Sequence, residues 1–228
     1  MTDHVRDLVS VREATDRLLT AAGKLDSGTV TQQSRLPGWT RGHVLAHLAR
    51  NADALVNVLE GRPMYVSAGA RDADIERDAP RGLDAHLADV RESAARFQDT
   101  GAAPADWSRT VELRNGVTDS ASRVPFRRWV EVELHHVDLG IGYELEDLPE
   151  EFVEREIDFL AQRFAGRPDV PPTRLTDGTR AWSTGGTAAE PAITVTGGRA
   201  DLLGWLAGRR DGSALAAEGG ALPALPPL

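Results

Sequence analysis

The 228-residue chain contains no cysteine, and this absence excludes several kinds of site. Disulfide frameworks, thiolate zinc fingers and cysteine nucleophiles all need that residue. A metal ion would therefore have to be held by histidine, aspartate or glutamate. Any thiol chemistry would need a thiol supplied by a small molecule.

Positive charge is also in short supply. The chain has 26 Lys and Arg against 35 Asp and Glu, which gives a formal net charge of −9. A surface of this sign argues against a general nucleic-acid binder and against a polybasic membrane anchor. Long hydrophobic runs are lacking, and the charged N-terminal segment has no apolar signal-peptide core. We therefore expect a cytoplasmic protein that binds neither nucleic acid nor membranes. A monomer is the expected oligomeric state.

Apolar residues recur at helical spacing through roughly the first 145 residues. Caps, turn residues and a proline in a first turn mark the ends of the segments. The predicted helices cover about residues 3–23, 40–61, 83–98 and 125–143. The connection 66–80 is polar, and 101–124 is irregular with a short extended piece. Four amphipathic helices with long connections predict a four-helix bundle over residues 1–147.

The sequence changes character near residue 148. One further helix is predicted over 150–166, and three short strand candidates and a closing helix follow it. These candidates are 173–178, 180–186, 192–198 and the helix 200–209. Residues 148–228 are enough for a small α+β domain. The predicted fold class is therefore mainly α, with an N-terminal helical bundle and a small C-terminal α/β domain.

Two segments each contain two histidines: HVLAH at 43–47, and EVELHH at 131–136, which also contains two glutamates. Glu131 and His135 are four residues apart, so they lie one helical turn apart on the same face. One interpretation is the solvated face of an amphipathic helix. The other is a site inside the bundle, where a buried Glu and His would need a partner such as a metal ion. His47 or His43 would then supply a third ligand, and zinc is the metal that best suits such a set, although other divalent ions also fit.

Several segments together resemble a known family. LPGWTRGHVLAHLARNADAL and RRWVEVELHHVDLGIGY carry the resemblance, and GRPMY, RDADIE and DLLGWLAGRRDG support it. In these segments the chain is similar to the mycothiol-dependent maleylpyruvate isomerase family, whose N-terminal domain is a DinB-like metal-binding bundle. The resemblance covers essentially the whole chain. It implies a C-terminal domain with a shape like that of sterol carrier proteins.

The resemblance also implies roles for particular residues. The family's metal ligands fall on His47, Glu131 and His135, and its catalytic arginine falls on Arg209, with Arg210 as the alternative register. A cation at this place would also complement the dipole of the closing helix, which is the structural explanation for either arginine.

The remaining histidines are interpreted differently. Glu133 and His136 are three residues apart and form a competing register for the metal site, which we rank below the first. His4 and His86 lie among polar neighbours and are expected at the surface.

The function implied by the resemblance is the cis–trans isomerisation of maleylpyruvate to fumarylpyruvate, with zinc or another divalent metal and mycothiol as cofactors. Addition of a thiolate to the C=C bond would allow rotation, and elimination would then release the trans product. Arg209 would bind a carboxylate of the substrate or stabilise the enolate formed on addition. The alternatives are a mycothiol S-transferase, which uses the same site without elimination, and a non-catalytic metal-binding bundle.

Overall fold

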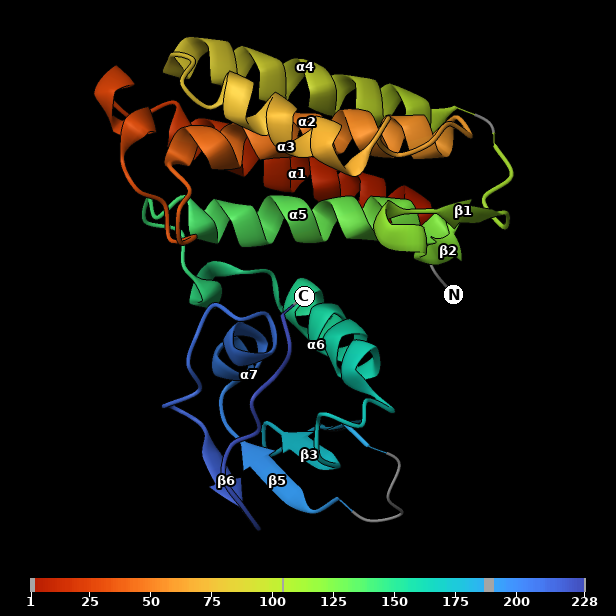
Figure 1. Cartoon of the computed structure of the whole chain (residues 1–228), viewed down its shortest axis with the longest axis vertical. Helices are drawn as coiled ribbons and strands as arrows, with labels where there is room; N and C mark the ends of the chain where they lie inside the picture. Colours follow the sequence, from red (N-terminus) through yellow and green to blue (C-terminus); the bar gives the residue numbers. More distant parts are fainter. Residues whose placement is uncertain (1–2, 104, 187–190, 228) are drawn as a thin grey trace. The chain divides into compact units, whose positions relative to one another are not determined.

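The computed structural model describes residues 3–103, 105–186 and 191–227. The chain divides into two compact units, Met1–Tyr143 and Glu144–Leu228, and each is described by itself. The predicted boundary after residue 147 falls four residues beyond this division. The predicted fold class, a helical domain followed by a small mixed domain, is confirmed (Figure 1). None of the described helices is both long enough and apolar enough to cross a membrane.

The described part of the N-terminal unit contains five α-helices and one short hairpin. The helices are α1 (His4–Ala22), α2 (Arg41–Leu59), α3 (Ala68–Asp78), α4 (Leu83–Ala102) and α5 (Val124–Asp138). The hairpin consists of β1 (Thr110–Glu112) and β2 (Thr118–Ser120), which pair antiparallel.

The four predicted helices form the bundle. α2 packs against α4 and α5, and α1 packs against the same two helices from the other side. Their buried stripes of Leu, Val, Ala and Phe make the core. The predicted caps are present, because Asp3 accepts a hydrogen bond from the Arg6 amide and Thr40 accepts one from the His43 amide. Figure 1 shows these helices side by side.

α3 is the helix that sequence analysis missed. Residues 66–80 were predicted as a polar connection. Among the α3 side chains that the structure describes, Ile75 is the one buried hydrophobic residue. The helix instead starts at a local signal, the Ser67 hydroxyl, which accepts a hydrogen bond from the Ala70 amide. It packs along α2.

The position expected for His86 was wrong, because this side chain is fully buried in α4. It lies three residues after Leu83 and four before Val90, on the stripe that faces the core. Its Nε2 is 3.3 Å from the carbonyl oxygen of Ala79, and burial lowers the pKa of its imidazole.

In the C-terminal unit, the residues that the structure describes form a four-stranded mixed sheet and two α-helices. Its elements are α6 (Glu150–Phe164), β3 (Thr173–Thr176), β4 (Ala181–Thr184), β5 (Ile193–Thr196), α7 (Arg199–Leu206) and β6 (Ala216–Glu218). The strand order is β4-β3-β5-β6, with β3 and β5 parallel and the outer pairs antiparallel. β6 was not predicted, since its sequence AAE contains no β-branched or aromatic residue.

One face of this sheet is covered by α6. Alternate residues point to that side, so that Leu175 of β3 pairs with Val195 of β5 and both are fully buried. The Thr184 hydroxyl donates to the carbonyl oxygen of Ala161 in α6 at 2.8 Å. These contacts give the C-terminal unit a core of its own.

Gly42, the second residue of α2, approaches the backbone closely enough to give a test of the packing. A Cβ atom there would lie 2.1 Å from the Ala79 carbonyl oxygen and 3.1 Å from Val30. We expect Gly42→Ala to lower the free energy of unfolding by about 1–3 kcal/mol, because the clash outweighs the higher helix propensity of alanine. Urea unfolding followed by circular dichroism would measure this.

Gly69 is the matched control. It is also the second residue of its helix, α3, and a Cβ there meets nothing within 4 Å. Gly69→Ala should leave stability unchanged or raise it by up to about 1 kcal/mol. Equal stabilities of the two variants would contradict the close approach at Gly42.

Candidate metal centre

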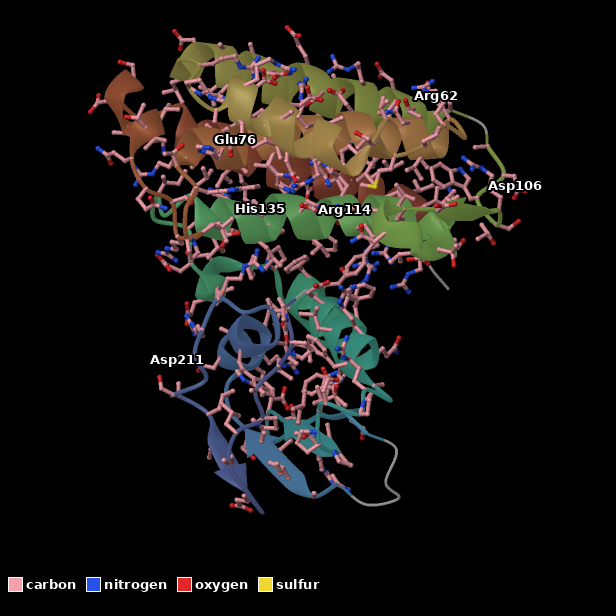
Figure 2. The ribbon with its side chains drawn as sticks, in the orientation of Figure 1. Arg62, Glu76, Asp106, Arg114, His135 and Asp211 are labelled. Carbon is pink, nitrogen blue, oxygen red and sulfur yellow. The ribbon has the colours of Figure 1, made fainter. Side chains whose placement is uncertain are left out.

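The three residues singled out from the sequence lie together between α2 and α5. His47 comes from the middle of α2, and Glu131 and His135 come from α5, where Figure 2 labels His135. His47 Nε2 is 2.9 Å from Glu131 Oε2, and His135 Nε2 is 3.3 Å from the same oxygen. One ligand atom from each residue lies within 4.8 Å of the other two. Two imidazole nitrogens and one carboxylate oxygen at these separations are a donor set that suits zinc and similar divalent ions.

The protonation states of two of these side chains, His47 and Glu131, suit metal binding. Burial lowers the pKa of His47 to about 4, despite the opposing effect of Glu131, so the ring is neutral near pH 7. Burial alone would raise the pKa of Glu131, but both histidines outweigh it and hold this pKa well below its usual range. A neutral imidazole and a carboxylate are the forms that bind metal ions.

Asp138 orients the His135 ring through the nitrogen that does not face Glu131. Its carboxylate is fully buried, and His135 Nδ1–H donates to Asp138 Oδ2 at 2.8 Å. Burial would lower the pKa of His135, but Asp138 and Glu131 outweigh it and raise this pKa. The hydrogen bond to Nδ1 leaves Nε2 directed at Glu131, as in the carboxylate–histidine pairs that support metal ligands.

Arg71, on α3, contacts the other ligand histidine, and sequence analysis did not single it out. Its Nη2 is 3.2 Å from His47 Nδ1, and a guanidinium can only donate, so Nδ1 accepts and Nε2–H points to Glu131. Arg71 also pairs with Asp72 at 2.7 Å and lies over the ring of Trp39. An ion bound to Nε2 would place the ring proton on Nδ1, so it would require the Arg71 side chain to move.

The competing register, Glu133 and His136, lies on a different face of α5 and makes structural contacts. The buried Glu133 carboxylate accepts three hydrogen bonds, from Arg17 at 2.6 Å, Trp129 at 2.9 Å and Tyr143 at 2.8 Å. His136 stacks on the ring of Tyr143, with centroids 4.0 Å apart. This carboxylate is therefore already satisfied by the protein.

His43, the other candidate for a third ligand, serves the start of α2. Its Nδ1 is 2.7 Å from the Thr40 hydroxyl, and the two residues form a reciprocal cap. It does not belong to the group of possible ligands around Glu131. The solvated-face interpretation also fails for His47 and His135, whose side chains are only 7% and 12% exposed.

The two candidate arginines lie just after α7 in the C-terminal unit. Arg209 is half-buried, and its Nη1 donates to the carbonyl oxygen of Ala207 at 2.7 Å, which is a contact expected of a cation at a helix C-terminus. Arg210 is held by two carboxylates, Glu146 and Asp201, each at 2.6 Å.

The contact between Asp138 and His135 gives a prediction about metal affinity. We expect Asp138→Asn to weaken zinc binding by about 10- to 100-fold, because the amide is a poorer acceptor for His135 Nδ1–H. Competition with a chromophoric chelator would measure the dissociation constant. Asp84→Asn, at an exposed aspartate on α4, is the control and should bind zinc as the unchanged protein does. Equal affinities for the two variants would show that Asp138 does not support a metal ligand.

Comparison with known proteins places the chain in a family. Residues 11–140 match the family described as the mycothiol maleylpyruvate isomerase N-terminal domain, and residues 147–227 match the MDMPI C-terminal domain. No curated protein matches the chain by sequence.

Among solved structures, the chain is similar to a crystal structure of the mycothiol-dependent maleylpyruvate isomerase, with 27% identity and a TM-score of 0.87. A histidine-to-alanine mutant of the mycothiol-dependent maleylpyruvate isomerase gives 26% identity and a TM-score of 0.86. Each match covers 99% of this chain and 97% of the other. Because both domains match in order and together span nearly all of the sequence, the chain belongs to the mycothiol-dependent maleylpyruvate isomerase family.

Proposed function

We propose that the protein is an isomerase that converts maleylpyruvate to fumarylpyruvate with a divalent metal ion, zinc in the first instance, and mycothiol. The observation that carries the proposal is the group formed by His47, Glu131 and His135 between α2 and α5. The absence of cysteine supports it, because a thiol-dependent reaction in this chain needs an external thiol. The likeness to the solved mycothiol-dependent isomerase supports the choice of reaction.

The chemistry needs a C=C bond to become temporarily single. Addition of a thiolate to one alkene carbon moves the π electrons onto the conjugated carbonyl as an enolate, and collapse of the enolate expels the thiolate after rotation. No proton, electron or thiol is consumed. A zinc ion at the site would lower the pKa of a bound thiol or polarise the substrate carbonyl.

In this proposal the residues of the chain have separate tasks. His47, Glu131 and His135 hold the ion, and Asp138 keeps His135 in the ligating orientation. Arg209 binds a carboxylate of the substrate or stabilises the enolate oxygen. Arg210, the alternative register, has its guanidinium bound to Glu146 and Asp201.

The assay that tests the reaction follows the absorbance of maleylpyruvate with zinc-loaded protein, with and without mycothiol. We expect conversion that requires the thiol, is lost on chelation of the metal and falls at least about 100-fold in His47→Ala. His43→Ala is the control on the same helix and should retain metal and activity, since His43 lies outside the ligand group. A stable mycothiol adduct as the product, with no fumarylpyruvate formed, would show an S-transferase instead.

Arg209→Lys tests the role of the arginine. Lysine keeps the positive charge but cannot make the bidentate hydrogen bonds that arginine makes with a carboxylate. We therefore expect kcat/KM for maleylpyruvate to fall about 10- to 100-fold. Arg210→Lys should change it little, because that side chain pairs with carboxylates of the protein. The same assay measures both variants. If the larger loss occurred in Arg210→Lys, the two roles would be reversed.

A further inference from the structure

The N-terminal unit also contains a cavity that has no role in the chemical steps described above. This cavity of about 600 Å³ lies between the C-terminal end of α2, residues 61–67 and the β1–β2 hairpin. Its volume falls within the roughly 300–1,000 Å³ of sites that enclose small organic molecules. Figure 2 labels Arg62 and Arg114, which both line it.

Tyr65 connects this cavity with the metal centre. Its side chain lines the cavity, and it is close enough to Arg71 and Glu131 for both charges to affect the pKa of its hydroxyl. Burial is the largest effect and raises this pKa, so the phenol stays protonated and can donate. Arg71 in turn contacts His47 Nδ1 at 3.2 Å. Tyr65 and Arg71 are therefore the side chains that lead from the cavity toward His47.

The distance between the cavity and the metal centre limits which molecules can reach both sites. His47 and Val58, which lines the cavity, are eleven residues apart on α2, or about 16 Å along the helix axis. A small keto-diacid such as maleylpyruvate cannot span that length. Mycothiol is an extended molecule, with its thiol on an acylated cysteine that is joined by an amide to glucosamine and then to inositol.

The lining of the cavity suits a polyol. Arg114 is exposed, and its side chain has no hydrogen bond or ion pair with the residues that the structure describes, so its guanidinium is available to hydroxyl groups. Glu112, exposed on β1, offers a carboxylate acceptor on the same wall. The ring of Tyr65 adds an apolar surface with a polar tip. Donors, acceptors and one aromatic ring are what a sugar and an inositol ring need.

We propose that this cavity binds the glucosamine–inositol part of mycothiol and directs the thiol past Tyr65 to the metal centre. The inference rests on the proposed use of mycothiol but adds the place where the cofactor is recognised. It assigns Arg114 and Glu112 to binding of the cofactor and not to the chemical step.

Binding of S-methyl mycothiol to the zinc-loaded protein tests the proposal directly. The methyl group prevents a thiolate–metal bond, so the affinity measured by calorimetry reports on the rest of the molecule. We expect Glu112→Trp, which fills the cavity and removes an acceptor, to weaken binding at least tenfold. Glu92→Trp, at an exposed glutamate on α4, is the matched control and should bind as the unchanged protein does. Unfolding temperatures would confirm that both variants are folded.

Arg114→Ala provides a second variant that fills no space. It should weaken binding about three- to tenfold, whereas Arg91→Ala, which removes an exposed arginine from α4, should not. Unchanged affinity in both cavity variants, or no binding to the unchanged protein, would overturn the proposal. So would a rise in KM for maleylpyruvate with the affinity for S-methyl mycothiol unaltered, since the cavity would then serve the substrate. Weakened binding in a protein without isomerase activity would support the cavity while refuting the proposed reaction.

Discussion

The contact on which the ligand group depends is a buried arginine that joins the two helices carrying it. Arg128 of α5 is completely buried, and its Nη1 donates at 2.8 Å to both the Leu48 carbonyl oxygen and the Asn51 side chain of α2. Burial lowers the pKa of this guanidinium to about 10, which still leaves it charged near pH 7. Because Leu48 follows His47 and Arg128 precedes Glu131 by one turn, the contact fixes the distance between the ligands. The buried charge of Arg128 therefore stabilises the arrangement of the two helices that carry the ligands.

The pairing of Glu131 with His135 could be read from the sequence because both lie on one helix, where spacing determines direction. The choice of His47 over His43 depended on the resemblance and on the apolar neighbours of His47. Arg71 could not be found in this way, since it reaches His47 from a helix that sequence analysis had taken for a loop. Contacts between elements depend on tertiary packing, which the spacing of residues along one chain does not reveal.

The fold was predictable to a similar extent, and the errors have physical causes. Long helices with wide apolar stripes were located closely, with caps at Asp3 and Thr40. α3 was missed because its stability comes from packing along α2 and not from an apolar stripe of its own. His86 was misplaced because its polar neighbours concealed a position on the core-facing stripe of α4. In the C-terminal unit, only the strand without β-branched residues escaped prediction.

The separation of the ligands along the chain has a consequence for folding. His47 and Glu131 are 84 residues apart in sequence, yet their side chains meet at 2.9 Å. An ion shared by the two would act as a cross-link that closes a long loop, and the entropy cost of closing such a loop rises with the logarithm of its length. Such a link between α2 and α5 would favour the native topology over partly folded states in which either helix has separated. The donor atoms of the metal site would then also stabilise the bundle.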